Sequence, residues 1–304
     1  MTSNDRASRL LGAALVAVAA VAFSGKAIII KLAYRHGVDA VTLLALRMLF
    51  SLPFFVLLGW WAGRRERGAP LSTADRWAVI GLGLIGYYLA SLFDFLGLQY
   101  ITAALERLVL FLYPTFVVLL SAVFFARPVT RRDLAALALS YLGIAFVFAN
   151  DFATQPGNVT LGTFWVLLSA LCYSVYLLGS GRLVGRMGSI RFACLAGIVS
   201  CIGVVAHFLV VSDASLLWRQ SAEVDGLALL MALVSTVLPI ILTSEGIRRM
   251  GASHASMVGS VGPVATIALG YWFLDEAVTA VQLAGAALVL AGVLAISLGR
   301  SPVK

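Results

Sequence analysis

The chain has 304 residues, of which 61% are hydrophobic and only 12% are charged. Soluble domains are nearer half apolar and a quarter charged, so this composition excludes a soluble protein and predicts a polytopic membrane protein. The net charge of +8 would suggest nucleic acid as a partner of a soluble chain. Here the basic residues lie in short loops and form no recognition motif, so we expect a lipid bilayer and no nucleic acid.

Hydrophobic runs long enough to cross a bilayer follow one another along almost the whole chain. A window of about 20 residues predicts ten spans, at residues 10–33, 40–62, 76–98, 102–126, 132–150, 160–180, 190–211, 226–246, 252–273 and 279–299. We therefore expect an all-α integral membrane fold with connections too short to hold a soluble domain. The first run begins like a cleavable signal peptide, but it continues to Ala33, and we interpret it as a retained span.

Lysine and arginine residues are distributed unevenly between the two sides of these spans. With the N-terminus placed in the cytoplasm, only Lys31, Arg35 and Arg219 lie on the outer side. The cytoplasmic segments carry Arg6, Arg9, Arg64, Arg65, Arg67, Arg76, Arg127, Arg131, Arg132, Arg182, Arg186, Arg191, Arg248, Arg249, Arg300 and Lys304. Because basic loops stay in the cytoplasm, we expect cytoplasmic tails at 1–9 and 300–304 in a cell (inner) membrane protein.

The two halves of the chain resemble each other at a constant offset. The matching pairs are Gly97 with Gly246, Ala103 with Ala252 and Pro114 with Pro263, each 149 positions apart. Each half holds five predicted spans, an odd number, so the two copies must cross the membrane in opposite orientations. We therefore predict two inverted five-helix repeats, 10–150 and 160–299. This arrangement is typical of secondary transporters, whose substrate site lies at the repeat interface.

Several short motifs are similar to those of one transporter group, the EamA-type ten-helix carriers of the drug/metabolite transporter superfamily. The motifs are Ala45-Leu46-Arg47, Leu112-Tyr113-Pro114, Val261-Gly262-Pro263 and the run Phe273-Leu274-Asp275-Glu276-Ala277-Val278-Thr279. The resemblance covers residues 10–299. It implies two EamA repeats, cytoplasmic termini, a central cavity and transport, often export, of small metabolites. Two positions depart from the family pattern: Arg127 replaces a glutamate that only the second copy keeps, and Lys26 replaces a neutral residue.

Five charged residues lie inside predicted spans of the first repeat. They are Lys26, Arg47, Asp94, Glu106 and Arg107. A charge at membrane depth costs about 2.5–3.5 kcal/mol on insertion scales, so such residues usually face a bundle interior or a watery cavity. We expect two ion pairs and one remaining cation, which would bind an anionic substrate group such as a carboxylate. The alternative is that these residues are structural or extend to the interface, as we expect of Lys31.

Helical spacing places further polar residues on common faces. Tyr87, Ser91 and Asp94 follow one another at i, i+4 and i+7, and Tyr173 and Tyr176 share a face of the sixth span. We predict that these faces line the substrate cavity, because a buried phenol needs a polar partner. The competing interpretation is that their serines join neighbouring helices.

Two prolines and two histidines complete the set of candidate residues. Pro114 and Pro263 lie inside spans and predict helix breaks or hinges, since proline frees a backbone carbonyl that neighbours must satisfy. His207 and His254 are weak candidates for proton coupling. The sequence leaves proton or ion coupling open, together with the oligomeric state.

These patterns favour a secondary transporter that exports small metabolites, such as amino acids or other carboxylates, by alternating access. An exporter of hydrophobic or cationic drugs is the alternative within this class, and a channel or membrane-embedded enzyme is the alternative outside it. The sequence contains no Walker A motif, no His-x-x-x-His and no Gly-x-Ser-x-Gly. We therefore predict no enzymatic activity, no catalytic residues, no metal and no cofactor.

Overall fold

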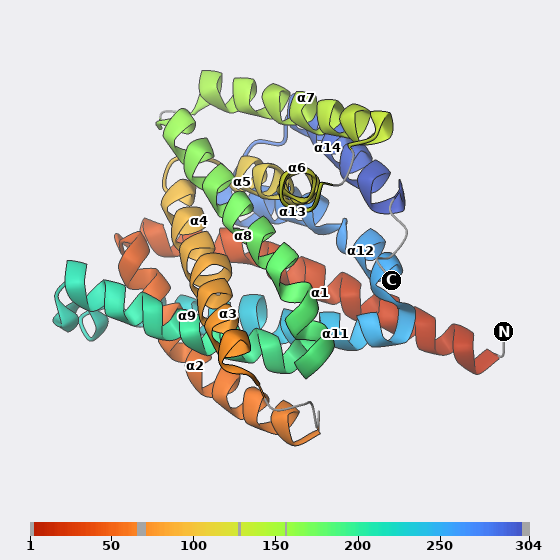
Figure 1. Ribbon diagram of the computed structural model, residues 1–304. Helices are drawn as coiled ribbons and strands as arrows, with labels where there is room; N and C mark the ends of the chain where they lie inside the picture. The colour runs from red at the N-terminus through yellow and green to blue at the C-terminus, as the bar shows by residue number, and fades with distance from the viewer. Residues whose placement is uncertain (1–2, 66–70, 127–128, 156, 300–304) are drawn as a thin grey trace.

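The computed structural model of the chain describes residues 3–65, 71–126, 129–155 and 157–299, and in these ranges the regular secondary structure is helical. The helices form one bundle, with the N-terminal end of α1 projecting from it (Figure 1). Three positions named in the sequence analysis, Arg67, Arg127 and the tail 300–304, lie outside the described residues.

The first half of the chain builds five spans from eight helical elements. These are α1 (Ser3–Arg35), α2 (Ala40–Arg65), α3 (Thr73–Gly83), the π-helical turn η1 (Leu84–Leu89), α4 (Ala90–Leu98), α5 (Ala103–Leu110), α6 (Tyr113–Phe125) and α7 (Arg131–Thr154). Elements α3, η1 and α4 form one continuous span. Helices α5 and α6 share another, and the helix is interrupted at Phe111 and Leu112, directly before the turn that contains Pro114.

The second half repeats this pattern. Its elements are α8 (Val159–Met187), α9 (Ser189–Val211), the 3₁₀ turn η2 (Ala214–Leu217), α10 (Ala222–Ala232), the π-helical turn η3 (Leu233–Val237), α11 (Leu238–Met250), α12 (Ala252–Gly259), α13 (Gly262–Leu274) and α14 (Ala280–Gly299). The two π-helical turns start 149 residues apart, as do the two left-handed residues Ala126 and Asp275. The predicted internal repeat is therefore present at the level of local backbone geometry.

The ten predicted spans are confirmed. Within the described residues, nine helical segments are long and apolar enough to cross a membrane, and a tenth, Ala280–Ala295, is shorter. Several boundaries differ from the prediction by up to four residues, and two differ by seven. Helix α8 continues to Met187, seven residues beyond the predicted end, and α1 starts at Ser3, so it extends into the predicted tail.

Capping residues explain several helix starts. The side chains of Ser72 and Thr130 accept hydrogen bonds from the backbone N–H groups of Asp75 and Asp133, and each aspartate bonds back to the cap. Thr102 caps α5 in the same position, without the reciprocal carboxylate. These residues separate consecutive apolar runs into discrete helices.

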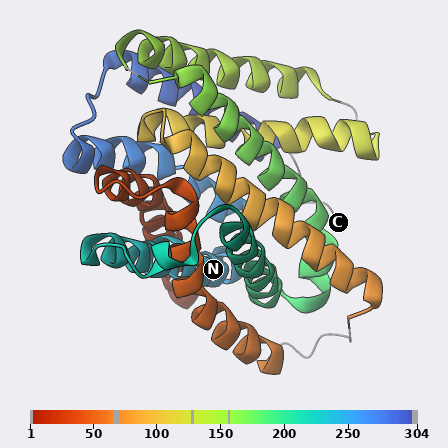
Figure 2. The same cartoon turned by 90° about the vertical axis from the view of Figure 1, so that its left-hand side faces the viewer.

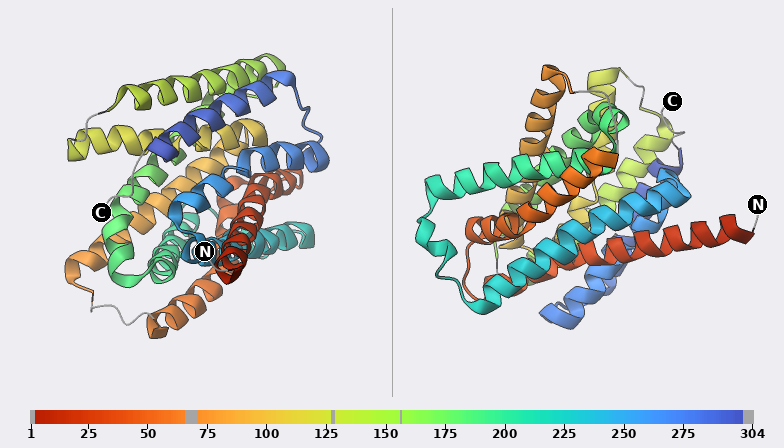
Figure 3. Two further views of the ribbon diagram at one scale, coloured as in Figure 1. Left: turned by 90° about the vertical axis from the view of Figure 1, so that its right-hand side faces the viewer. Right: turned by 90° about the horizontal axis from the view of Figure 1, so that it is seen from below.

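The first helix of each repeat packs against helices of the other repeat. Helix α1 lies against α11 and α13, and α8, its counterpart, lies against α4 and α6. Figure 2 shows α8 beside α4, and Figure 3 shows α7 beside α14 at one edge of the bundle and α2 beside α9 in the view from below. This intertwined packing places the first helix of each repeat between elements of the other. The centre of the bundle is therefore built by both repeats.

Glycines allow the closest of these crossings. A Cβ atom on Gly97 would lie 2.5 Å from the Val166 Cγ2 atom and 2.9 Å from the carbonyl oxygen of Gly162. At the equivalent crossing, a Cβ on Gly246 would lie 2.3 Å from the Val16 Cγ2 atom. The backbones of α4 and α8, and those of α1 and α11, can therefore approach each other closely, because these two glycines have no side chain.

Candidate functional site

A central cavity of about 580 Å³ lies between the two repeats. Its lining reaches from Lys26 and Asp94 in the interior to Val184 and Ser189, on either side of the α8–α9 turn. This volume is in the range of pockets that hold small organic ligands. Both π-helical turns contribute to the lining, through Tyr87 of η1 and Thr236 of η3. Single π-turns inside α-helices are frequent at functional sites.

The deep end of the cavity contains a buried cluster of charges around Lys26. The Lys26 Nζ atom lies 2.5 Å from Asp94 Oδ2 and 3.5 Å from Glu106 Oε1. All three side chains are buried, and Glu106 is 0% exposed. The cavity is lined by Lys26 and Asp94, while Glu106 lies behind them and is absent from the lining.

Two arginines line the cavity without a carboxylate partner among the described residues. Arg47 donates from Nε to Thr236 Oγ1 at 3.1 Å, and its Nη1 atom has no hydrogen-bond acceptor. The Arg107 guanidinium stacks over Phe23 at 4.8 Å from the ring centroid, and its Nη2 atom donates a long hydrogen bond of 3.5 Å to Ser24 Oγ. The expectation of two ion pairs and one free cation is therefore wrong. One lysine contacts both carboxyl groups, and both arginines are unpaired.

Space for Arg107 comes from the second repeat. A Cβ atom on Gly262 would lie 2.8 Å from the Arg107 Nη2 atom. The Val261-Gly262-Pro263 motif thus brings the start of α13 against the guanidinium, which a larger residue would displace. The close approach of Arg107 at the cavity therefore explains why this motif has a glycine at position 262.

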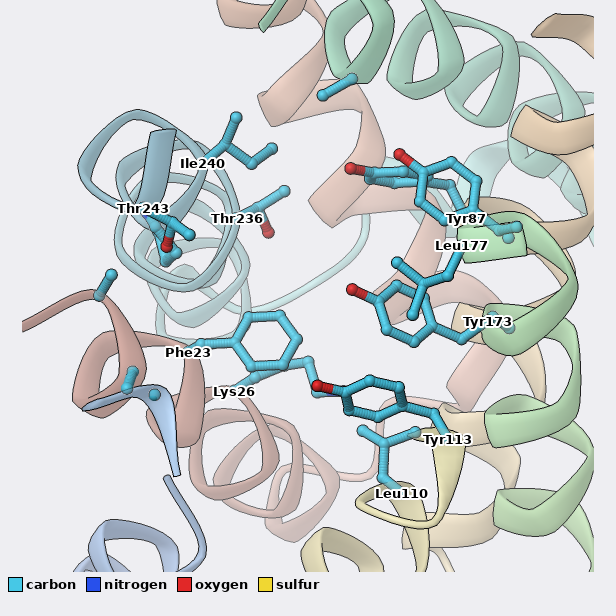
Figure 4. Close-up of a pocket in the computed structure, with 18 of the residues that line it drawn as sticks. Phe23, Lys26, Tyr87, Leu110, Tyr113, Tyr173, Leu177, Thr236, Ile240 and Thr243 are labelled. Carbon is cyan, nitrogen blue, oxygen red and sulfur yellow. The ribbon is translucent and has the colours of Figure 1, made fainter. Parts of the chain in front are cut away.

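Tyrosines form one wall of the cavity. Tyr87, Tyr113 and Tyr173 come from η1, α6 and α8, and Figure 4 shows their hydroxyl groups pointing toward the wall that holds Phe23, Lys26 and Thr236. The Tyr113 and Tyr173 rings meet edge to face at 5.2 Å, as do those of Tyr87 and Tyr176. The wall therefore presents both aromatic faces and hydroxyl donors to a bound molecule.

The end of the bundle opposite the α8–α9 turn, beyond Lys26, is closed by contacts between the repeats. Lys31 Nζ lies 3.2 Å from Glu276 Oε1 and donates a hydrogen bond to the carbonyl oxygen of Ile101. Glu276 also accepts from the backbone N–H of Ala103 at 2.9 Å. Lys31, which we expect to extend to the interface, keeps a side chain that is 25% exposed, and its ammonium joins the first repeat to the second.

The predicted site residues are largely gathered at one place. Those that line the cavity are Lys26, Arg47, Tyr87, Ser91, Asp94, Arg107, Tyr173 and Tyr176. Glu106 contacts the cluster from behind. Pro114 and Pro263 lie in the first turns of α6 and α13, directly after the breaks. Neither His207 nor His254 belongs to the lining.

Sequence reasoning missed four residues of the cavity and its closed end. Phe23 carries no pattern that distinguishes it from a packing aromatic, and the Leu112-Tyr113-Pro114 motif by itself does not show that the Tyr113 side chain enters the cavity. Thr236 could have been found, because it is the repeat equivalent of Tyr87 at the same offset of 149. Glu276 was noticed as a family residue, but its link to Lys31 depends on a chain reversal that spacing does not reveal.

Comparisons with known proteins agree with this architecture. The pattern of the EamA-like transporter family matches residues 10–149 and 160–298. The "Uncharacterized transporter YcbK" of Bacillus subtilis (strain 168) is 30% identical over 277 residues, covering 90% of this chain and 88% of that protein. An "Uncharacterized transporter" of Synechocystis is 23% identical over 309 residues, covering 92% and 91%. A solved structure titled "Crystal structure of protein" aligns with a TM-score of 0.57 at 18% identity over 98% of both chains, a likeness of fold alone.

Proposed function

Because the chain belongs to the EamA-like transporter family and is a multi-pass membrane transporter, we propose that it is a secondary carrier that exports small metabolites bearing a carboxylate. The observation that carries this proposal is the pair of arginines in the cavity. Arg47 and Arg107 are each 5% exposed and have no ion pair within the described residues. A buried cation without a partner is costly, and a bound anion would relieve that cost.

The tyrosine wall supports the size and character of the substrate. Its aromatic faces lie across the cavity from Phe23, so the non-polar part of a solute would rest between rings while its carboxylate reaches an arginine. Amino acids and aromatic or aliphatic carboxylic acids have this combination of groups.

The cavity also supports a direction of loading. With the basic loops in the cytoplasm, the α8–α9 turn is cytoplasmic, and the cavity extends toward it from the charge cluster. The Lys31–Glu276 contact closes the opposite end. We propose that this arrangement is the inward-facing state of an inner-membrane carrier, with both termini cytoplasmic. Rocking of the repeats 10–150 and 160–299, with bending at Pro114 and Pro263, would open the outer end.

Export of a hydrophobic cation is the competing function. It would need an accessible carboxylate, and Asp94, the carboxylate in the cavity lining, already contacts Lys26. The charge of the cavity therefore favours an anion.

Counterflow into proteoliposomes tests the proposal. The purified protein would be assayed with labelled benzoate, lactate and phenylalanine, and with tetraphenylphosphonium as the cationic competitor. Arg107→Gln should reduce carboxylate exchange by about tenfold to a hundredfold, the usual effect of losing a charged hydrogen bond. Arg64→Gln is the matched control, since that guanidinium stacks on Trp60 and is absent from the cavity lining. Unchanged exchange in a folded Arg107→Gln protein, or exchange of the cation alone, would contradict the proposal.

A further inference from the structure

Glu106 is a buried carboxyl group without a hydrogen-bond donor from its surroundings. Its side chain is 0% exposed, and neither carboxyl oxygen accepts a hydrogen bond from the described residues. Lys26 lies 3.5 Å away, but its ammonium is hydrogen-bonded to Asp94 at 2.5 Å. The carboxyl groups of Asp94 and Glu106 lie close together, because both contact the same Lys26 ammonium, at 2.5 and 3.5 Å.

Two buried carboxyl groups that share one ammonium do not both ionise readily. Asp94 has the lysine as its direct partner, so it is the group that carries the negative charge. A protonated Glu106 gains a donor hydrogen, which an ionised one lacks, and can donate it to Asp94. Asp94 and Glu106 can therefore hydrogen-bond to each other when the two carboxyl groups together hold one proton.

Other charged and titratable groups surround Glu106 and its helix, and the cations among them, Lys26 and Arg107, act against its protonation while burial and Asp94 favour it. The charged or titratable groups around Glu106 and its helix are Lys26 on α1, Arg47 on α2, Asp94 on α4, Arg107 on α5, Tyr113 on α6, Asp151 on α7, Tyr173 on α8 and Glu276 after α13. Asp151 and Glu276 bond to Thr102 and Ala103, at the start of α5 and about a turn before Glu106.

We propose that Glu106 is the binding site of a transported proton, which enters from the cavity through Asp94 and crosses the membrane together with the anionic substrate. This inference rests on the carrier function proposed above. Asp94 lines the cavity and Glu106 does not, so Asp94 is the carboxyl group through which a proton from the cavity can reach Glu106. Protonation converts the Glu106 carboxylate to a neutral acid, and deprotonation on the other side returns it, with no other bond changed.

Charge counting gives the sign of the coupling. With Glu106 ionised, three cations and two anions leave the cluster at +1, and with Glu106 protonated the cluster carries +2. An anion in the cavity therefore binds better when Glu106 is protonated, and by reciprocity the anion strengthens proton binding. Proton and anion then move in the same direction, so the proposed export requires an outward anion gradient that exceeds any opposing proton gradient.

Infrared spectroscopy tests the proton site without any substrate. At neutral pH the wild-type protein should show a carbonyl band of a protonated carboxylic acid that is missing from Glu106→Gln. The control Glu245→Gln should keep the band, because Glu245 is paired with Arg248 and Arg249 at a partly exposed position. Identical bands in wild type and Glu106→Gln would overturn the assignment.

Thermal unfolding in detergent provides a second measurement. Glutamine is a neutral isostere of protonated glutamate, so Glu106→Gln should unfold at the wild-type temperature. A Glu106→Gln protein that fails to fold, or that unfolds well below wild type, would mean that an ionised Glu106 holds Lys26, and the proposal would be wrong.

Binding of benzoate tests the coupling. Benzoate stays ionised from mildly acidic to alkaline pH, so its own titration does not interfere. Wild type should bind it about tenfold more tightly at the acidic end, within the usual range of coupling between two sites, and Glu106→Gln should lose this dependence. Benzoate affinity that is independent of pH in wild type would overturn the coupling. Absence of benzoate binding alongside the infrared band would leave the proton site standing and count against the carboxylate specificity instead.

Discussion

Substitution of Lys26 is the sharpest test of the charge cluster. The Lys26–Asp94 pair joins α1 to α4 in the bundle interior, with side-chain exposures of 7% and 2%. Removing one partner of a buried ion pair typically costs 3–5 kcal/mol, because the other charge is left without compensation. We therefore expect Lys26→Gln to lower the free energy of unfolding by about 4 kcal/mol.

Asp94→Asn should cost less than Lys26→Gln, although both break the same pair. Glu106 lies 3.5 Å from the Lys26 ammonium and can ionise to replace the lost aspartate. No second cation is as close to Asp94 among the described residues, so Lys26→Gln has no such replacement. We expect about 1–2 kcal/mol for Asp94→Asn, and the double variant should be more stable than Lys26→Gln alone.

A thiol-reactive dye follows this unfolding, because Cys194 and Cys201 are 0% and 1% exposed and react only when the bundle opens. Arg248→Gln is the matched control, since its ion pair with Glu245 is at the surface and is screened by solvent, so its loss should have little effect on stability. Equal losses for Lys26→Gln and Asp94→Asn, or a Lys26→Gln loss no larger than the control, would refute the reasoning.

Three further predictions concern the helix crossings, a helix end and the closed outer end. Gly97→Ala should destabilise the fold by about 1–3 kcal/mol through overpacking against the backbone of α8, while Gly226→Ala, which meets no atom within 4 Å, should be neutral in the same unfolding assay. Ala126 has a φ of 51°, so Ala126→Gly should raise stability by about 1 kcal/mol, and a loss would show that its side chain matters more than its backbone. Glu276→Gln should loosen the outer closure and increase labelling of Ser91→Cys, in the cavity, by a membrane-impermeant maleimide added outside cells; unchanged labelling would contradict a closing role.

The fold was predictable from sequence because its determinants are local and repeated. Apolar runs set the ten spans, and the match of Pro114 with Pro263 located both interrupted helices. The ends of α1 and α8 were not predictable, because both helices extend into polar segments where hydropathy falls while the backbone remains helical.

The sequence predicted which charged residues belong to the candidate site, but it did not predict which of them form ion pairs. Charge at membrane depth identified Lys26, Arg47, Asp94 and Arg107, all of which line the cavity. Pairing depends on which helix faces cross, and spacing along the chain does not determine that. Lys31 illustrates the difficulty, since its partner Glu276 lies in a connection of the other repeat.

The cavity charges belong to one copy only. At the repeat offset of 149, Asp94 corresponds to Thr243 and Glu106 to Ala255, and both of these neutral residues line the cavity. The first copy thus supplies all the ionic groups of the described cavity lining together with part of its neutral wall, and the second copy supplies neutral side chains. Substitutions in the later half can alter which solutes fit while the electrostatics stay as they are, so related carriers can diversify their cargo by mutating one side of the molecule.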